Sequence, residues 1–325
     1  MSRREYFARK LALAALTLAV VVLLDFFLFR VLPGDPVRAV IGRNVRISKE
    51  VQDALRVQFG LDQPLFPNQF LATVGQWARG NLGVSWSLRL PVAEVLAAKL
   101  GNTLLLISAG QTLSIVLGVG LGLFAGWKRK TAIDVGALTF SLVMWAVPTF
   151  WLGIILLVAG SAWLGLPTGG TLDPANLGKP YWQIIPDLAR HLVLPTLTFT
   201  VVYLGEYTLI MRSSVLEVLS EDYILTAKAK GLSHWQILRR HALKNAMLPI
   251  ITLVALNLGF TMSGAIYIET VFSYDGLGKL FQSALTKQDF PLLQGAFLLL
   301  AVSVILANLV AEVLYTYLDP RVKAI

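Results

Sequence analysis

Residues Ser220 to Pro249 read SEDYILTAKAKGLSHWQILRRHALKNAMLP, the most polar stretch of a chain that is otherwise mostly apolar. The stretch predicts two short helices. In the first, Ser220 is a good N-cap, acidic residues occupy the first turn, basic residues the last, and Gly231 can adopt the left-handed stop. This helix is expected to have about 10 residues, or ~15 Å. Ser233 opens the second helix, and Gln236 completes a capping box. A well-capped helix between two apolar runs indicates a rigid part that another protein grips.

The composition identifies the class of protein. Of the 325 residues, 56% are hydrophobic and 14% are charged, whereas soluble domains have about 25% charged residues. Several apolar runs approach or exceed ~18 residues, which is enough to cross a bilayer as a helix. The chain has no cysteine and three scattered histidines, so neither a disulfide nor a metal site is expected. We therefore predict an all-α polytopic membrane protein, and we expect its net charge of +9 to meet lipid rather than nucleic acid.

Six apolar stretches are candidates for membrane spans. The first follows a basic segment, and a cleaved signal peptide is the alternative for it. The second contains Gly118, Gly122 and Gly126 at the four-residue spacing that lets two helices approach closely. The third is interrupted by Pro148, and is either one kinked span or two short ones. In order, the stretches are Leu11 to Phe29, Thr103 to Trp127, Ala132 to Leu166, Leu192 to Met211, Leu248 to Ile268 and Leu292 to Leu314.

The polar segments between these stretches differ in length. Val37 to Lys99 is long enough to form a small folded loop domain, with helices expected after Ser48, from Pro67 and from Pro91. Pro167 to Arg190 and Glu269 to Phe290 are expected to be short loops. We predict an amino-terminal segment with the first span (1–30), an extracytoplasmic loop domain (31–100) and a core of spans (101–325) that includes a cytoplasmic loop (213–247).

The distribution of cations predicts the topology. Lys and Arg gather at the amino terminus, at Lys128 to Lys130 and between Arg212 and Lys244, whereas the short outer loops hold few. Cytoplasmic loops carry the excess of Lys and Arg, and loops above ~60 residues are largely exempt from this rule. Splitting the third stretch at Pro148 would move the opening stretch to the outside. We therefore predict six spans, both termini in the cytoplasm and Ser220 to Pro249 on the cytoplasmic side.

The sequence contains no catalytic constellation. It lacks the phosphate-binding loop of ATPases, the HExxH motif and the GxSxG motif, so we do not expect the chain to hydrolyse ATP. Two acids lie inside predicted spans and more than two residues from the ends of those spans, and such residues are functional candidates. Asp25 lies five residues, or about 7.5 Å, from the outer end of its span. Contact with water at that end is one explanation for an acid at this position. Glu206 lies deeper and is a candidate for a transport path, with an interhelical hydrogen bond as the alternative.

Several motifs resemble those of one family. The sequences SSVLEVL (Ser213 to Leu219), EDYI (Glu221 to Ile224) and TAKAKGLS (Thr226 to Ser233) resemble the cytoplasmic signature loop of binding-protein-dependent ABC importer permeases, dipeptide/oligopeptide/nickel branch. Asn245 and Leu248-Pro249 fall where that loop enters the fifth span. Five further segments are similar to the branch in the same order, namely LPGDP (Leu32 to Pro36), GLDQP (Gly60 to Pro64), GNLGVS (Gly80 to Ser85), HLVLP (His191 to Pro195) and DPRV (Asp319 to Val322).

The resemblance implies a type I ABC importer permease fold and a mechanism. Two homologous permeases form the pore, two cytoplasmic ATPases bind ATP and Mg, and an extracytoplasmic binding protein delivers the solute. This chain then binds no cofactor itself and sits in a bacterial or archaeal inner membrane. Peptides are the expected solute, with nickel, opines or oligosaccharides as alternatives; a secondary carrier is the alternative of another class. The implied contacts with the ATPase are Glu221, Asp222, Tyr223, Ile224, Thr226, Ala227, Lys228, Ala229, Lys230, Gly231, Leu232, Arg239 and Arg240.

Two positions depart from the family's pattern. The general permease signature has Glu-Ala-Ala six to four residues before its glycine, where this chain has Leu225, Thr226 and Ala227. The role of that glutamate therefore does not carry over. The branch often has proline before Gly276, where this chain has Asp275, so we expect the loop to differ in shape.

Overall fold

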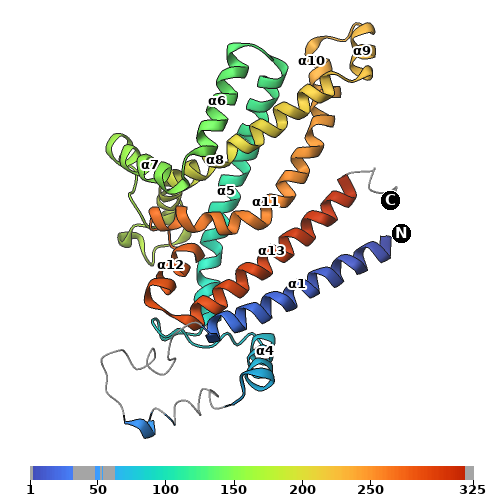
Figure 1. Cartoon of the computed structure of the whole chain (residues 1–325). Coiled ribbons are helices and arrows are strands. Elements are labelled where there is room, and N and C mark those ends of the chain that lie inside the picture. Colours follow the sequence, from blue (N-terminus) through green and yellow to red (C-terminus); the bar gives the residue numbers. More distant parts are fainter. Residues whose placement is uncertain (1–2, 32–47, 52, 54–62, 319–325) are drawn as a thin grey trace. The chain divides into compact units, whose positions relative to one another are not determined.

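The described residues are mainly helical (Figure 1). A computed structural model describes residues 3–31, 48–51, 53 and 63–318. These residues form no strand beyond an isolated bridge between Val84 and Pro91. The chain divides into two compact units. The first comprises residues 1–101 and 279–305, and the second comprises residues 102–278 and 306–325. We describe each unit separately.

Four helices are long and apolar enough to cross a membrane, and a bent pair is a fifth candidate. The four are α1, α5, α8 and α13, and the pair is α6 with α7. The predicted fifth span lies in α11, whose side chains at 258–264 are outside the described residues. The main helices are α1 (Arg3–Val31), α4 (Phe70–Ala78), α5 (Val92–Trp127), α6 (Ala132–Ala146), α7 (Thr149–Leu164), α8 (Tyr181–Leu219), α9 (Asp222–Ala229), α10 (His234–Ile237), α11 (Leu243–Val271), α12 (Leu277–Lys287) and α13 (Phe290–Leu318).

A ladder of small residues packs α5 against α8 in the second unit. A Cβ atom at Gly118 would lie 2.6 Å from Cβ of Tyr207, and one at Gly122 would lie 2.5 Å from the carbonyl oxygen of Thr208. A Cβ atom at Gly126 would lie 2.9 Å from Cβ of Val215. These distances confirm the close approach predicted from the spacing. The ladder also extends further toward the start of α5 than predicted, through Ser114 and Gly110.

The third apolar stretch is broken at Pro148. Helix α6 ends at Ala146, α7 begins at Thr149, and the two axes differ by 104°. Proline cannot donate a backbone hydrogen bond and disfavours helical geometry in the residue before it. Val147 is accordingly extended, with φ −74° and ψ 129°. The third apolar stretch is therefore two helices joined by a sharp bend.

Two helices are longer than the predicted spans within them. The loop helix expected from Pro91 and the second span form one continuous helix, α5, because no proline separates them. Helix α8 has 39 residues and contains Pro186 and Pro195, so much of the predicted loop Pro167 to Arg190 is helical. At 1.5 Å per residue, α8 is about 58 Å long, nearly twice the thickness of a bilayer core. Helix α8 is therefore longer than a single membrane crossing requires.

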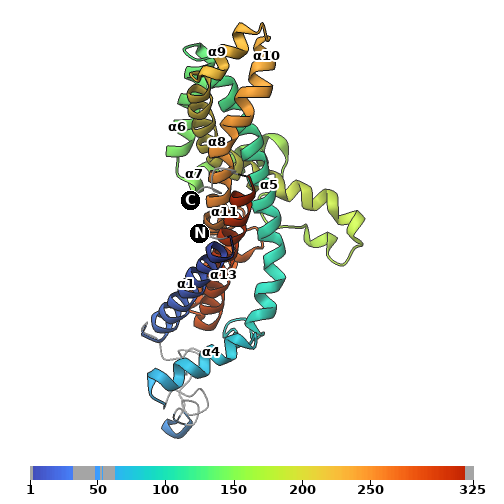
Figure 2. The same ribbon diagram turned by 90° about the vertical axis from the view of Figure 1, so that its right-hand side faces the viewer.

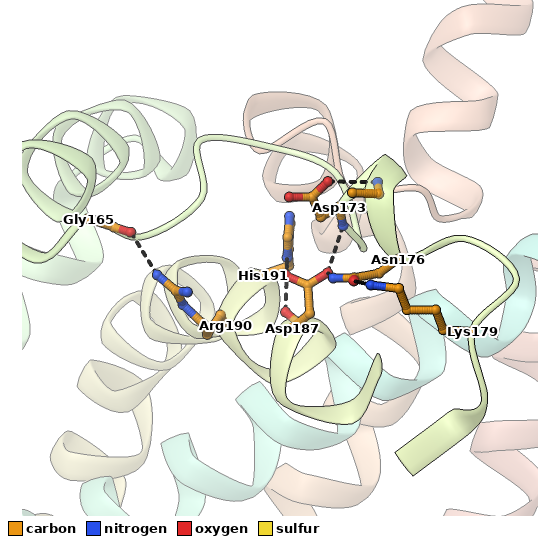
Figure 3. A network of polar contacts seen from close by, with 8 residues as sticks. Gly165, Asp173, Asn176, Lys179, Asp187, Arg190 and His191 are labelled. Atoms are coloured by element: carbon orange, nitrogen blue, oxygen red, sulfur yellow. Dashed lines mark hydrogen bonds and ion pairs between the residues drawn. The ribbon is translucent and has the colours of Figure 1, made fainter. Parts of the chain in front are cut away.

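The connection before α8 is held together around the Asp187 carboxylate (Figure 3). Asp187 accepts hydrogen bonds from the backbone N–H of Asp173, 2.8 Å, and from the side chain of Asn176, 2.9 Å. His191 lies one turn further along α8, with Nδ1 3.2 Å from the Asp187 carboxylate. Arg190 donates to the carbonyl oxygen of Gly165 at the end of α7. This network holds the connection between α7 and α8 against the first turns of α8.

In the first unit, Asp289 joins the segment before α5 to the start of α13. Its carboxylate accepts hydrogen bonds from the hydroxyls of Ser85 and Ser87, 2.6 and 2.7 Å, and from the backbone N–H groups of Trp86 and Ser87. The Trp86 ring packs edge-on against Phe290. Asp289 is buried, so its partners replace the water that it loses.

Parts of the predicted loop domain lie outside the described residues. They include the LPGDP segment, most of GLDQP and most of the helix after Ser48, and the DPRV segment near the carboxyl end of the chain is also outside the described residues. The helix expected from Pro67 is present as a π-helical turn, Leu65–Gln69, that continues into α4. As predicted, α4 ends before Gly80, which has a φ of +77°.

Candidate functional site

The candidate site is the connection from α8 to α11, where the sequence predicted two capped helices. The structure has a short first helix, α9, followed by α10, by a π-helical turn, η3 (Leu238–Ala242), and by α11. In both views α9 and α10 lie at the same end of the second unit as the turn between α5 and α6 (Figures 1 and 2). The connection therefore lies at the end of the unit where a second cationic segment, Lys128 to Lys130, is found.

The predicted N-cap of the first helix is wrong. Ser220 belongs to the end of α8, and its hydroxyl donates to the carbonyl oxygen of Glu217, 2.6 Å. No proline or glycine interrupts the segment SSVLEVL, so α8 continues through the first part of the predicted loop to Leu219. The extended residue before α9 is Glu221, whose side chain makes no cap hydrogen bond. Helix α9 consequently has 8 residues rather than about 10.

The other predicted boundaries are confirmed. Gly231 follows α9 with a φ of +75°, the left-handed conformation that ends many helices. The Ser233 hydroxyl accepts a hydrogen bond from the N–H of Gln236, 3.4 Å, and the Gln236 side chain accepts one from the N–H of Ser233, 2.9 Å. This is the predicted capping box, and it fixes the start of α10.

The hairpin of α9 and α10 has a small core of its own. Ile224, Ala227 and Ile237 are buried together, and Leu219 and Leu232 pack around them. A second link joins the hairpin to α11, because the Asn245 side chain donates a hydrogen bond to the Tyr223 hydroxyl, 2.9 Å. The core and this link hold the hairpin in a fixed orientation against the long helices.

The outer surface of the hairpin combines cations with apolar side chains. Leu225 and Trp235 are each 60% exposed. Neither was among the predicted contacts, although an apolar residue within a polar stretch is a signal of binding. Of the predicted contacts, Ile224 and Ala227 face the core of the hairpin and Leu232 packs around it. The exposed ones are Glu221, Asp222, Tyr223, Thr226, Lys228, Ala229, Lys230, Gly231, Arg239 and Arg240.

An ion pair that the sequence did not predict lies close to this connection. Arg212 on α8 donates to both carboxylate oxygens of Asp134 at the start of α6. Asp134 also accepts a hydrogen bond from the N–H of Lys130, 2.8 Å, in the turn after α5. The only signal in the sequence was one acid and one base at the ends of separate apolar runs. The pair ties the ends of α5, α6 and α8 together.

The two acids of the predicted spans have different surroundings. Glu206 is partly buried and accepts a hydrogen bond from Asn257 on α11, 2.9 Å. The interhelical hydrogen bond that was the alternative explanation for Glu206 is thus present in the structure. Asp25 is 1% exposed, and neither of its carboxylate oxygens has a hydrogen-bond partner. The expectation that water contacts Asp25 is therefore wrong, because neighbouring residues cover it.

The predicted short loop from Glu269 to Phe290 is also different, because it contains α12. Glu269 is fully buried and accepts hydrogen bonds from the Thr103 hydroxyl, 2.6 Å, and from the N–H of Gly278, 2.7 Å. A Cβ atom at Gly276 would clash with this carboxylate, so any side chain there would force the buried Glu269 side chain to move. Burial, together with the charge of Glu269, raises the pKa of Tyr274 to about 12.

Within the described residues, no group of His, Asp and Glu side chains is arranged to hold a metal ion. The described surface of the hairpin offers charge, exposed apolar area and a fixed geometry instead. These are the properties of a docking element rather than of a catalytic centre.

Comparison with known proteins agrees with this description. Residues 118–324 match the model of the binding-protein-dependent transport system inner membrane component, and residues 4–107 match the model of its N-terminal region. The chain is 36% identical over 333 residues to a di/tripeptide transport system permease protein, DppB, of Pseudomonas aeruginosa, with 98% of each chain covered.

Two further relatives are similar along their whole length. A dipeptide transport system permease protein, DppB, of Escherichia coli K12 is 34% identical over 336 residues, with 98% of each chain covered. An oligopeptide transport system permease protein, AppB, of Bacillus subtilis 168 is 32% identical over 320 residues, covering 98% of this chain and 99% of the relative. The chain therefore belongs to the family of binding-protein-dependent transport system inner membrane components.

Proposed function

We propose that this chain is a membrane-spanning permease subunit of an ATP-driven importer that carries di- and oligopeptides into the cell. The observation that carries the proposal is its similarity, over nearly the whole chain, to relatives named as peptide permeases. The chain itself is not an enzyme in this proposal. ATP and Mg bind to two separate ATPase subunits, and a second, homologous permease completes the pore. An extracytoplasmic binding protein delivers the peptide.

The proposed topology has six spans with both termini in the cytoplasm. The spans lie in α1, in α5, in the broken pair α6 and α7, and in α8, α11 and α13. The hairpin of α9 and α10 then faces the cytoplasm, and the loop domain of residues 31–100 faces outward. Two observations support this orientation: the cations concentrate near the hairpin and near the turn between α5 and α6, and both lie at one end of the second unit.

The hairpin is the proposed coupling element. Its exposed side chains contact an ATPase subunit, and its small core keeps α9 rigid against α8 and α11. Closure of the ATPases then moves α9 and the long helices together, which switches the pore between two states. We propose that Glu206 lies on the translocation path. Asp25 is a second candidate, because the sequence places it within the first span.

Two experiments test the proposal. The complex with its partner permease, ATPases and binding protein is reconstituted in liposomes, and uptake of labelled dipeptides is compared with uptake of nickel and of an oligosaccharide. ATP-dependent peptide uptake is expected, and uptake of nickel or sugar alone would overturn the assigned substrate. In the second experiment, Arg239 and Arg240 are changed to Glu, and Lys287→Glu on α12 serves as a control on another exposed surface. Loss of ATPase co-purification in the double variant alone is expected, and an unchanged yield would remove these residues from the interface.

A further inference from the structure

Glu206 lies within the predicted fourth span, five residues from its inner end, which is about 7.5 Å along the helix. A carboxylate at this depth is costly, and residues of this kind mark functional sites. Within the described part of the chain, no Lys or Arg side chain pairs with it, and its hydrogen bond comes from the neutral Asn257. Glu206 is also only partly buried. Its carboxylate can therefore interact with a positively charged ligand.

An aromatic ring lies beside this carboxylate. Tyr203 is three residues before Glu206, so the two side chains share one face of α8. The Tyr203 ring stacks on the fully buried Phe199, with ring centroids 4.5 Å apart and planes at 26°. This stack fixes the ring and leaves Tyr203 partly exposed. A carboxylate close to an aromatic ring is a combination that binds ammonium groups, through charge and through the cation–π interaction.

A hydrogen-bonded network holds the carboxylate in place. The Asn257 amide donates both to Glu206 and to the hydroxyl of the buried Tyr207, and that hydroxyl also accepts a hydrogen bond from Gln111. The Gln111 carbonyl oxygen is buried without a partner. The network takes its members from α5, α8 and α11, so a movement of these helices against one another would change the geometry around Glu206. A site of this kind can hold a ligand in one state and release it in the other.

We propose that Glu206, Tyr203 and Asn257 form a site that holds the ammonium group of a peptide as it crosses the membrane. The group is the side-chain ammonium of a lysine residue in the peptide. The inference rests on the peptide import proposed above and adds a preference for cationic over anionic peptides. Asn257 acts as a positioning residue, because it orients the carboxylate through its amide.

The test measures uptake by the complete complex in liposomes. Wild type, Glu206→Gln and Glu206→Asp are each supplied with alanyl-lysine and with alanyl-glutamate, both at concentrations that saturate the binding protein. Glu217→Gln is the matched control, because Glu217 is an exposed carboxylate further along α8. We expect Glu206→Gln to lower the ratio of lysine to glutamate peptide uptake about fivefold, the effect of a partly exposed ion pair. Glu206→Asp should retain most of the preference, and Glu217→Gln should leave it unchanged.

The outcomes separate this inference from the proposed function. If Glu206→Gln lowers the uptake of both peptides equally, the residue has a structural role and the ammonium site is refuted. If both the uptake and the ratio stay at wild-type values, Glu206 takes no part in the path. In either case peptide import itself still stands. If the wild-type complex transports neither peptide, the peptide function fails and the site fails with it.

Discussion

Arg212 and Asp134 form a two-point ion pair, with Nε 2.5 Å from Oδ1 and Nη2 2.9 Å from Oδ2. The pair lies beside the contact between α5 and α8, since a Cβ atom at Gly122 would be 3.1 Å from the backbone nitrogen of Arg212. Seven residues further along, α8 ends and the hairpin begins. The fixed position of the hairpin relative to α5 and α6 therefore depends on a planar guanidinium that meets a carboxylate at two points.

The first prediction is that Asp134→Asn destabilises the protein. The Asp134 side chain is 4% exposed and that of Arg212 is 21% exposed, so the variant leaves a mostly buried cation without its counter-charge. Removing one partner of a buried pair costs about 3 kcal/mol or more, and the partial exposure of Arg212 reduces this to about 2 kcal/mol. Thermal unfolding in detergent measures the loss. Glu217→Gln, which removes an exposed carboxylate from α8, should melt like wild type, and equal melting of Asp134→Asn would contradict the prediction.

The second prediction uses two glycines on opposite faces of α5. In Gly122→Ala the new methyl group meets the carbonyl oxygen of Thr208 at 2.5 Å and Cβ of Met211 at 2.8 Å, so α5 and α8 must separate. Overpacking of this kind costs about 1 to 3 kcal/mol. Gly120→Ala is the matched control, because its Cβ has no neighbour within 4 Å and the gain in helix propensity is the same. We expect a lower melting temperature for Gly122→Ala alone, and similar melting of both variants would show that α5 and α8 are not tightly packed.

Local sequence patterns predicted the features that depend on local geometry. The ladder through Gly118, Gly122 and Gly126 was readable because its spacing fixes one face of a helix. The capping box at Ser233 and the stop at Gly231 were readable for the same reason. The N-cap at Ser220 was wrong because hydrogen bonding within α8 competes for this residue, and its hydroxyl bonds to a carbonyl oxygen of that helix.

Contacts between distant segments were not predictable from one sequence. Asp134 and Arg212 are 78 residues apart, and Ser85 and Asp289 are 204 residues apart. Each residue alone looks like an ordinary polar residue near the end of an apolar run. Only the arrangement of the helices brings the partners together, and the same is true of the link between Glu206 and Asn257.

The third prediction concerns the pH dependence of Asp289. Burial raises the pKa of this carboxyl, but hydrogen bonds from Ser85, Ser87 and the N–H of Trp86 outweigh burial, so the pKa lies below its usual value of 3.8. A group whose pKa is lower in the folded state contributes stability above its unfolded pKa, and this stability is lost as the pH falls through the folded pKa. Wild type should therefore lose stability below about pH 4, and Asp289→Asn should lose less over the same range.

Asp289→Asn also tests the hydrogen bonds at neutral pH. The amide cannot accept as many hydrogen bonds as the carboxylate, so the segment around Ser85 should loosen and the melting temperature should fall. Glu94→Gln is the control, because Glu94 is an exposed acid of the same unit. If both variants respond to pH like wild type, the Asp289 carboxylate does not carry the acid sensitivity.

The fourth prediction separates coupling from folding at Gly231. A Cβ atom there would have no neighbour within 4 Å, so the only obstacle to a side chain is the φ of +75°. A β-branched residue is strained in this conformation by about 1 to 2 kcal/mol, whereas asparagine adopts it more readily. We expect Gly231→Val to distort the end of α9, so that ATP hydrolysis in the reconstituted complex continues while peptide uptake falls. Gly231→Asn should keep the two rates linked. Coupled uptake by Gly231→Val at the wild-type rate would show that the end of α9 does not transmit the movement of the ATPases.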